Sequence, residues 1–332
     1  MSKKTYILVD TLNMFFRAKH VGGGRDIDMR VGMAMHIMFN SVKKVWREFD
    51  GSHVVFCLEG RSWRKDFYEP YKKNRAVVLD KRTEREKEED DFWWEAFDHF
   101  CTFVKENSNC SVLREPTSEA DDLIALWIQA HPDDKHVIIS SDSDFYQLIT
   151  PNVSLYNGVA NQIVTANGFY DEKDKPIKDK KTGEVKLPPN PEWLLFEKCM
   201  RGDSADNVFS AYPKVRKNKL EEAFADRENQ GFVWNNLMLQ RWTDHNGVEH
   251  RVKECYERNK KLIDLTQQPE EIRTKVFAEI LQAQNPKHVD QVGIRFMKFC
   301  AKYGLTKLSE QPTDHAQYLN AGYPGVESQA NN

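Results

Sequence analysis

The sequence predicts an α/β fold, an open parallel sheet with helices between its strands. Three apolar runs each end in an acidic residue, at Tyr6–Asp10, His53–Glu59 and Val137–Asp142. A continuous apolar run is typical of a parallel strand that is buried on both faces, and helical segments separate these three runs. Sites in such sheets form at the carboxyl ends of the strands, where the acids stand.

The composition is that of an ordinary globular protein. The chain has 332 residues, of which 40% are hydrophobic and 30% charged, enough to bury one large core or two. The net charge of −3 decides nothing about nucleic acid, because clustered acids can hide a local basic face. Six cysteines without a C-x-x-C pair argue against a zinc site and predict reduced thiols in the cytoplasm. Neither a signal peptide nor a stretch of membrane-spanning length is recognisable, so we expect no membrane contact.

After the first strand, residues 29–49 have helical periodicity. Several methionines lie on the apolar face of this helix, and we interpret them as core packing. Residues 61–75 then interleave six cations with four aromatic rings, a pattern typical of single-stranded nucleic-acid channels. The mixed-charge run at residues 80–91 is interpreted as a solvated helix face.

The second half of the chain reads as an exposed insertion followed by helices. Residues 157–189 are rich in Gly, Lys, Asp and Pro, and a helix is expected from Pro191 to Met200. We predict an α/β domain over residues 1–200, with a helical arch at about 61–100. A helical nucleic-acid-binding domain over 201–310 and a flexible tail over 311–332 follow.

Each acidic cluster has an ordinary interpretation when it is taken alone. Ser118, for example, can cap a helix, with Asp121 closing a capping box. Taken together, the acids predict a site for hard divalent cations, because gathered carboxylates repel one another unless cations lie between them. The predicted set consists of Asp10, Glu59, Glu119, Asp121, Asp122, Asp142, Asp144, Asp203 and Asp206.

The spacing within the clusters suits coordination of Mg²⁺ or Mn²⁺. Glu119 and Asp122 are three positions apart, hence neighbours on one helix face. Asp142 and Asp144 are expected to alternate along an extended segment, and both can face one side only if the pair is extended. Such a set can hold two ions about 3.5–4 Å apart, one activating a water and the other stabilising the departing oxygen of a phosphodiester.

The basic residues supply charge for a phosphate. Lys72 and Arg75 share a face if their segment is helical, and we expect both to act in catalysis. Tyr71 is expected to stack on a base. Further contacts to nucleic acid are expected from exposed cations and their neighbours, namely Arg64, Lys65, Tyr71, Lys73, Lys214, Arg216, Lys217 and Lys219.

At these residues the sequence resembles the flap endonuclease and 5′-nuclease family, in particular the branch with the ribonuclease H of T-even bacteriophages. The resemblance extends from about Tyr6 to Leu308. It rests on residues 7–10, 63–67, 71–75, 119–122, 139–145, 202–207 and 256–264. Two departures stand out. Glu59 occupies a position where the family more often has Asp, and residues 209–216 lack the glycines of the family's duplex-binding turn.

The resemblance implies a PIN-like parallel-sheet domain with a helical arch and a C-terminal helical region that binds duplex. It implies a first metal surrounded by Asp10, Glu59, Glu119, Asp121 and Asp142. Asp144, Asp203 and Asp206 would serve a second metal, with Asp122 near both. Lys72 and Arg75 match the pair that contacts the scissile phosphate in the family.

The function predicted is that of a Mg²⁺-dependent 5′-3′ exonuclease and flap endonuclease that removes RNA primers or DNA flaps during phage-type DNA replication. We expect a monomer in the cytoplasm of the host cell. It would act on DNA and RNA/DNA duplexes with 5′ ends or flaps, with a single-stranded DNA-binding protein or a sliding clamp as protein partner. Three alternatives are a catalytically silent scaffold, a PIN-type endoribonuclease and a small-molecule phosphatase. The nearly complete acid set disfavours the first, and the basic-aromatic stretch disfavours the other two.

Overall fold

The computed structural model describes residues 3–19, 26–285 and 287–325. The chain forms two compact units. The first, the α/β unit, combines Met1–Arg61, Thr83–Pro188 and Pro269–Asn332. The second, the helical unit, combines Ser62–Arg82 with Pro189–Gln268. Each unit is therefore assembled from segments that lie far apart in the sequence.

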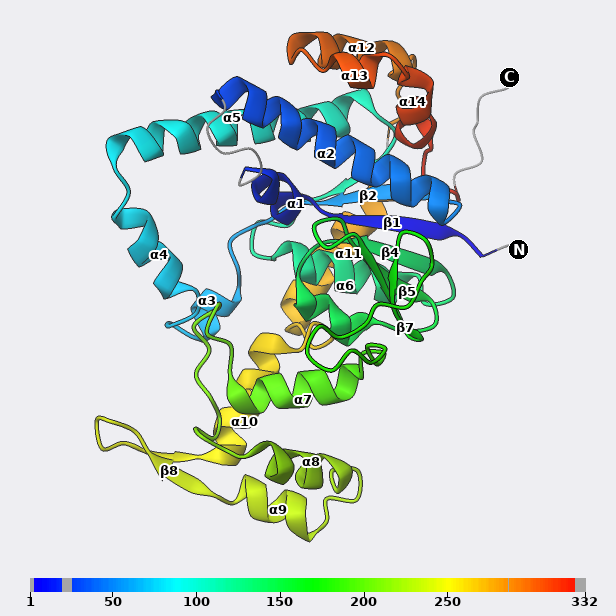
Figure 1. The fold of residues 1–332 in the computed structure, drawn as a ribbon. Coiled ribbons are helices and arrows are strands. Elements are labelled where there is room, and N and C mark those ends of the chain that lie inside the picture. Colours follow the sequence, from blue (N-terminus) through cyan, green and yellow to red (C-terminus); the bar gives the residue numbers. More distant parts are fainter. Residues whose placement is uncertain (1–2, 20–25, 286, 326–332) are drawn as a thin grey trace. The chain divides into compact units, whose positions relative to one another are not determined.

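A seven-stranded sheet forms the centre of the α/β unit (Figure 1). Its strand order is β3-β2-β1-β4-β5-β6-β7, in which the first five strands are parallel and the last two join in antiparallel fashion. This mostly parallel sheet confirms the predicted fold class. The strands are β1 (Thr5–Asp10), β2 (His53–Cys57), β3 (Ser111–Leu113), β4 (Lys135–Ile139), β5 (Val153–Asn157), β6 (Gln162–Thr165) and β7 (Gly168–Asp171).

The central strands are buried because their side chains are apolar on both faces. Every residue of β1 and β2 is buried, as expected of parallel strands covered by helices on two sides. In Figure 1, α2 and α6 lie on opposite faces of the sheet, and both contact β1. The pairing of Asp10 with Cys57 and of Val9 with Ile139 aligns the carboxyl ends of β1, β2 and β4.

The helices of the α/β unit supply most of the core. On α2 the side chains of Met35, Met38, Val42 and Val45 are buried, so the methionine-rich face does pack in the core. The helices are α1 (Thr11–Ala18), α2 (Ile27–Glu48), α5 (Glu84–Asn107), α6 (Ala120–Ala130), the 3-10 helix η1 (Ser143–Leu148), α11 (Glu270–Ala283), α12 (Val292–Lys302), α13 (Thr306–Ser309) and α14 (Pro312–Asn320).

The segment expected to be a flexible tail contains a helix. Residues 312–320 form α14, where the side chains of Tyr318 and Leu319 are fully buried. Their burial outweighs the polar composition around them, because two large apolar side chains can anchor a short helix. The final part of the expected tail, residues 326–332, lies outside the described residues.

The helical unit contains six helices and a small hairpin among its described residues. Its larger core joins Phe196, Met200, Leu220 and Leu237, and a second cluster surrounds Tyr71. The elements are α3 (Arg64–Phe67), α4 (Lys73–Asp80), α7 (Pro191–Arg201), α8 (Lys217–Ala225), α9 (Phe232–Met238), β8 (Arg241–Thr243), β9 (Glu249–Arg251) and α10 (Val252–Ile263).

The two units differ from the domains expected from the sequence. Residues 61–100 were expected to form one arch, but Ser62–Arg82 packs with Pro189–Gln268 whereas α5 belongs to the α/β unit. The C-terminal helices α11–α14 also join the α/β unit, where α11 contacts α6 and α14 contacts α2. The compact units therefore do not correspond to continuous stretches of the sequence.

Two further expectations concern membranes and thiols. Among the described residues, no helix combines the length and apolar character that crossing a bilayer requires. The cysteines are all free, as the scattered spacing predicts.

Candidate active site

Asp10 stands at the carboxyl end of β1 and is held by a serine from the neighbouring strand. The Ser140 hydroxyl donates a hydrogen bond of 2.7 Å to Oδ2 of Asp10. The same Ser140 oxygen accepts a hydrogen bond from the backbone N–H of Asp142, at 3.0 Å. Ser140 is fully buried, so it fixes the positions of two acids from adjacent strands. We therefore regard Ser140 as a positioning residue.

Glu59 follows β2 and points at the start of α6. Its Oε2 accepts a hydrogen bond from the N–H of Ala120 at 3.0 Å, where the helix dipole favours a negative charge. The next residue, Gly60, donates its N–H to the carbonyl of Ser118. A Cβ on Gly60 would lie 2.3 Å from the carbonyl oxygen of Glu115. Only glycine therefore allows the backbone after Glu59 to lie this close to the backbone at Glu115.

The first turn of α6 carries three acids with different surroundings. Glu119, which is buried, is the residue that caps the helix, whereas the sequence suggested Ser118. The carboxylate that closes the capping box belongs to Asp122, which accepts the Glu119 N–H at 3.2 Å, and not to Asp121. Asp122 is fully buried and at least partly structural, while Asp121 stays available for the site.

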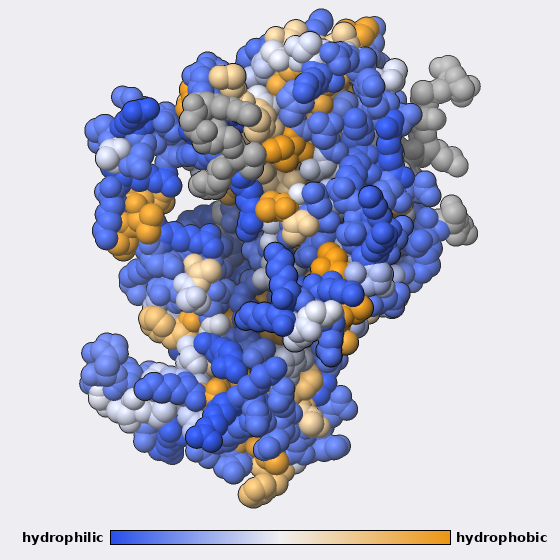
Figure 2. All heavy atoms as spheres, in the orientation of Figure 1, coloured by the Kyte–Doolittle hydropathy of each residue, from blue (hydrophilic) through white to orange (hydrophobic). Residues whose placement is uncertain are grey.

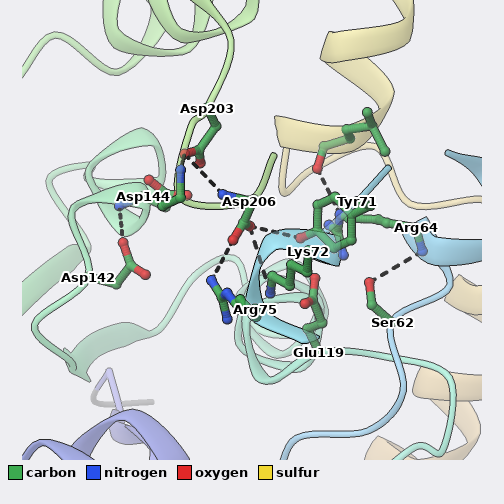
Figure 3. Close-up of polar contacts among 12 residues, drawn as sticks. Ser62, Arg64, Tyr71, Lys72, Arg75, Glu119, Asp142, Asp144, Asp203 and Asp206 are labelled. Atoms are coloured by element: carbon green, nitrogen blue, oxygen red, sulfur yellow. Dashed lines mark hydrogen bonds and ion pairs between the residues drawn. The ribbon is translucent and has the colours of Figure 1, made fainter. Parts of the chain in front are cut away.

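Asp142 and Asp144 belong to a tight turn and not to an extended segment. Asp142 precedes the 3-10 helix η1 and accepts the N–H of Asp144 at 2.9 Å (Figure 3). The expectation of two acids alternating along a strand is therefore wrong. The short polar side chain of Asp142 favours this helical cap over continued extension because it satisfies a backbone donor.

The acids of the α/β unit act on one another electrostatically. The pKa of Asp10 is raised to about 7, mainly by burial and further by the charges of Glu59 and Asp142. The hydrogen bond from Ser140 opposes this increase. The pKa of Asp121 lies well above its ordinary value, because of burial and then the charges of Asp10, Glu119, Glu59 and Asp142. The structure thus gathers the five acids that the resemblance assigned to a first metal, and their binding of a metal stays a prediction.

The donor atoms around the cluster determine which kind of cation would fit there. Among the described residues, no group of three or more histidine, cysteine, aspartate and glutamate side chains is already arranged to hold a metal ion. Burial, followed by the charges of Asp10 and Asp121, keeps the pKa of Cys57 well above its usual range, so this thiol stays protonated. The donors left are carboxylate oxygens, which suit a hard divalent ion.

In the helical unit, one carboxylate gathers three side chains from the basic-aromatic stretch. The Tyr71 hydroxyl donates to Oδ2 of Asp206 at 2.9 Å, and the Lys72 ammonium lies 3.7 Å from the same oxygen. Arg75 pairs with Oδ1 at 2.5 Å. Figure 3 shows all three side chains pointing toward Asp206.

Backbone contacts fasten this stretch further. The N–H of Lys72 donates to the carbonyl of Asp206, and the Asn207 side chain donates to the carbonyl of Pro70. Lys72 itself adopts a left-handed backbone conformation, with φ at 54°. Such a conformation is unfavourable for a lysine and persists only where surrounding contacts impose it. The position of the Lys72 side chain is therefore strongly determined.

Asp203 lies in the same loop as Asp206 but has a different partner. The Lys198 ammonium lies 2.8 Å from its Oδ2. Burial raises the pKa of Asp203, but the hydrogen bond and charge of Lys198 outweigh it, so that the pKa falls below its ordinary value. Asp203 and Asp206 thus belong to the helical unit and each carries a cationic partner there. Their assignment to a second metal with Asp144 stays a prediction.

Two residues that we expected to contact nucleic acid are buried inside the helical unit. Arg64 is 1% exposed, and its Nε donates to the carbonyl of Leu262 at 2.7 Å. Tyr71 is 4% exposed and packs in the cluster with Cys199 and Val208. Neither side chain can stack on a base or reach a phosphate, so the structure corrects both predictions. The residues' types suggested an exposed role, whereas tertiary packing uses them as core.

The other expected contact residues are accessible cations. Lys65, Lys73, Lys214, Arg216 and Lys217 are exposed. Lys219 is half-buried, with its ammonium over the ring of Tyr212. Lys73 forms an ion pair with Glu69, and Lys217 lies 3.6 Å from Glu221. Lys214 takes the left-handed backbone conformation, with φ at 58°, at a turn where the resembling family has glycines.

The helix α4 is unusual because it buries no residue. It exposes Val77, Val78 and Leu79, with 54%, 64% and 49% of their surface accessible. Figure 2 shows an orange hydrophobic patch over this helix. The first turn carries Arg75, so cationic and apolar side chains share one short exposed element.

Several residues that shape the site were missed from the sequence. Ser140 and Gly60 position acids, Lys198 neutralises Asp203, and Asn13 accepts hydrogen bonds from Ser141. A serine directly after a buried strand and a glycine directly after an acid are signals that could have identified the first two. No local signal points to Lys198, because its partner is known only once the loop has folded.

Comparison with known proteins gives a family match over the N-terminal half of the sequence. A model described as the 5′-3′ exonuclease, N-terminal resolvase-like domain, matches residues 5–175. The DNA polymerase I of Rhizobium leguminosarum is 29% identical over 177 residues, which are 51% of this chain and 15% of the polymerase. The flap endonuclease Xni of Aeromonas hydrophila is 27% identical over 155 residues, 45% of this chain and 54% of that protein.

Phage proteins are similar in sequence and in fold. The ribonuclease H of Enterobacteria phage T4 is 27% identical over 203 residues, 57% of each chain. The chain thus covers only 15%, 54% and 57% of the lengths of these three curated relatives. A structure of T5 5′-exonuclease with divalent metal ions (zinc) bound has a TM-score of 0.59 at 18% identity, covering 94% of this chain and all of that one.

A second T5 structure, the bacteriophage T5 D15 flap endonuclease in complex with DNA and metal ions, has a TM-score of 0.56 at 17% identity. It covers 95% of this chain and all of the T5 chain. At such identities these two structures establish the likeness of fold. Because the family model spans more than half of its residues, the chain belongs to the 5′-3′ exonuclease family defined by the N-terminal resolvase-like domain.

Proposed function

We propose that this protein is a divalent-metal-dependent 5′-3′ exonuclease and flap endonuclease. It hydrolyses phosphodiesters at the 5′ ends of RNA primers or DNA flaps during DNA replication. The observation that carries the proposal is the gathering of five acids, of which Asp10, Glu59 and Asp142 follow aligned strands while Glu119 and Asp121 stand at the start of α6. Such a desolvated group of carboxylates is costly unless cations neutralise it. The names of the relatives support the same activity.

Mg²⁺ is the proposed cofactor, with two ions in each site and Mn²⁺ as a substitute. The all-oxygen donor set favours hard ions over zinc. When bound, such ions supply an activated water and stabilise the charge on phosphate oxygens. Asp144, Asp203 and Asp206 are proposed for the second ion, with Asp122 nearby.

The cations of the helical unit are proposed to hold the substrate. Arg75 is 55% exposed at its side chain, so its guanidinium can grip a phosphate in two places. Lys72 adds a second positive charge from a backbone position that the surrounding contacts fix. Both remain near Asp206 until a phosphate competes for them. Contacts to the phosphate backbone are proposed for Lys65, Lys73, Lys214, Arg216, Lys217 and Lys219. Such contacts position the protein on the nucleic acid but do not recognise its sequence.

The proposed substrates are DNA and RNA/DNA duplexes with 5′ ends or flaps. The similarity to a T5 enzyme that was crystallised with DNA supports this choice. The proposed setting is the cytoplasm, which agrees with the free cysteines, and it is that of the host cell if a phage encodes the chain. We further propose a monomer whose protein partners include a single-stranded DNA-binding protein or a sliding clamp.

The experiment that tests this proposal uses three 5′-labelled substrates: a DNA flap, a nicked duplex with an RNA 5′ end, and plain single strand. Each is incubated with the protein in Mg²⁺ or in EDTA, and the products are sized. We expect short products from the 5′ end in Mg²⁺ and none in EDTA. Binding without cleavage would instead favour a scaffold, and cleavage of single-stranded RNA alone would favour a PIN-type endoribonuclease.

A variant extends this experiment to the site. Asp144→Asn should abolish cleavage while the affinity for the flap substrate stays within about twofold, because one ligand charge is lost but the cationic surface is intact. Cleavage at the parental rate would remove Asp144 from the metal site. Asp133→Asn serves as a control, because this aspartate is exposed and lies in the loop after α6.

A further inference from the structure

A pocket of about 500 Å³ opens between α5 and α12 in the α/β unit. The two helices pack against each other, and both help to close the core of that unit. None of its lining residues belongs to the acidic cluster or to the helical unit. The proposed nuclease activity therefore leaves this pocket without a role.

The charged side chains that line the pocket are all basic. Arg295, Lys298 and Lys302 of α12 line it, and their spacing places them along one side of the helix. His99 of α5 lies opposite, 3.5 Å from the Lys302 ammonium. No aspartate or glutamate lines the pocket among the described residues, and α12 itself contains none. The result is a concentrated patch of positive potential.

The hydrogen-bond partners of Arg295 do not cancel its charge. Arg295 donates to the side-chain oxygen of Asn107 at 3.0 Å and to the backbone carbonyl of Asp290 at 2.9 Å. Both acceptors are neutral groups. Desolvated carboxylates on a ligand would therefore find complementary charge here, which aids both association and specificity.

The floor of the pocket is apolar but does not offer a flat aromatic face. Phe103 and Phe299 lie with their centroids 4.5 Å apart and are only 4% and 8% exposed. Ile294, by contrast, is 55% exposed at the rim. A nucleobase needs an open ring face on which to stack, which these buried rings do not provide. A compact apolar side chain can instead fill the hollow against Ile294.

We propose that the pocket between α5 and α12 docks an acidic peptide segment of a partner protein, with one bulky apolar side chain seated in the pocket. The carboxylates of the segment pair with Arg295, Lys298 and Lys302, while the apolar side chain contacts Ile294 and the edges of the two phenylalanines. Charge complementarity selects an acidic ligand, and the concave apolar floor selects a protein segment over a nucleic-acid backbone.

The test uses the full chain and a fluorescent peptide in which one phenylalanine is flanked by three acidic residues on each side. Fluorescence anisotropy should show saturable binding that weakens with salt. Lys298→Glu should weaken this binding at least about tenfold, because it removes one attraction and adds one repulsion. The matched control is Lys307→Glu, an exposed lysine on α13 outside the pocket, which should change the affinity less than twofold.

Four further measurements decide the proposal. A peptide with alanine in place of phenylalanine should bind at least about fivefold more weakly, since the apolar contact is lost; equal binding would overturn the pocket. A lysine-rich version of the peptide should bind Lys298→Glu better than the parent protein, which also shows that the variant is folded. If Lys298→Glu weakened binding of a single-stranded oligonucleotide as much as that of the peptide, the surface would belong to nucleic acid instead. Cleavage of the flap substrate should not change in Lys298→Glu.

Discussion

Arg75 and Asp206 lie 131 positions apart in the sequence and form an ion pair with a nitrogen-to-oxygen distance of 2.5 Å. Lys72 and Tyr71 reach the same carboxylate. One acid thus keeps two proposed phosphate-binding cations together in the absence of substrate. A phosphate that competes for the two cations would find them already positioned, so little reorganisation would be needed.

Replacing Arg75 with alanine tests this arrangement. Arg75→Ala should lower the rate constant for single-turnover cleavage of a 5′ flap about 10²–10³-fold, by analogy with the loss of a preorganised charge stabiliser. The affinity for Mg²⁺, measured by titrating activity, should change little. Lys81→Ala is a suitable control, because this lysine is an exposed cation at the end of α4. A rate within threefold of the parent protein would show that Arg75 does not act on the reacting phosphate.

The acidic cluster should cost stability in the absence of metal. Asp121→Asn removes one of five mutually repelling carboxylates, so we expect the melting temperature of the metal-free protein to rise by about 2–4 °C for each kcal/mol of relieved repulsion. Cleavage should be lost at the same time. Differential scanning fluorimetry in EDTA measures the first effect and a flap assay the second.

Metal addition gives the complementary result. Mg²⁺ or Mn²⁺ should raise the melting temperature of the parent protein, because an ion that binds only the folded state stabilises it. The increase should be much smaller in Asp121→Asn. If both proteins responded equally to the metal, Asp121 would not be part of the ion-binding site.

Gly60 should not tolerate a side chain. In Gly60→Ala the new Cβ would meet the carbonyl oxygen of Glu115 at 2.3 Å, and the loop that carries Glu59 would have to move. We expect the free energy of unfolding to fall by about 2–3 kcal/mol and cleavage to slow. Gly322→Ala is the matched control, because nothing lies within 4 Å of its added Cβ. Urea denaturation of both variants measures the difference, and equal losses would contradict the crowding at Gly60.

His53 should make the protein sensitive to acid. Burial lowers the pKa of His53 from 6.5 to about 4, although contacts with the carbonyls of Ala321 and Gly322 oppose the shift. Because this pKa is lower in the folded than in the unfolded state, the unfolded chain takes up a proton first. The contribution of His53 to stability is complete above pH 6.5 and is lost as the pH falls toward 4.

The comparison with His53→Gln isolates this effect from other titrating groups. Between pH 7.5 and 4.5, the parent protein should lose up to about 3 kcal/mol more unfolding free energy than the variant. Chemical denaturation at several pH values measures both. Parallel stability curves would show that His53 is protonated equally easily in the folded and unfolded states.

The sequence predicted the parts of the structure that depend on local pattern. The apolar runs that end at Asp10, Glu59 and Asp142 did form neighbouring parallel strands or their extensions. A run of consecutive apolar residues is enough to predict a buried strand, because the signal is local. The family match confirms the predicted relationship. The same pattern brings Asp10, Glu59 and Asp142 to one edge of the sheet, because parallel strands end there. Glu119 and Asp121 stand at the start of α6, and only the resemblance to the family grouped them with the other three.

The parts that were missed depend on partners distant in the sequence. Arg64 and Tyr71 looked like nucleic-acid contacts, but Leu262 and Asp206 hold them inside the helical unit. Tyr318 gave little sign of being a core residue within a polar segment. In each case the local sequence gives the chemical type of the side chain but does not determine which distant residues it contacts in the fold.

The composition of the helical unit from Ser62–Arg82 and Pro189–Gln268 has a consequence for synthesis on the ribosome. Folding during translation proceeds from the N-terminus. The stretch that contains Lys72 therefore leaves the exit tunnel long before α7 and α10 exist to receive it. Until residue 268 has emerged, this basic and aromatic stretch has no packing partners from its own unit. We expect the nascent chain to be most exposed to proteases and chaperones there until residue 268 has emerged, and the α/β unit to be completed last, because its final segment is Pro269–Asn332.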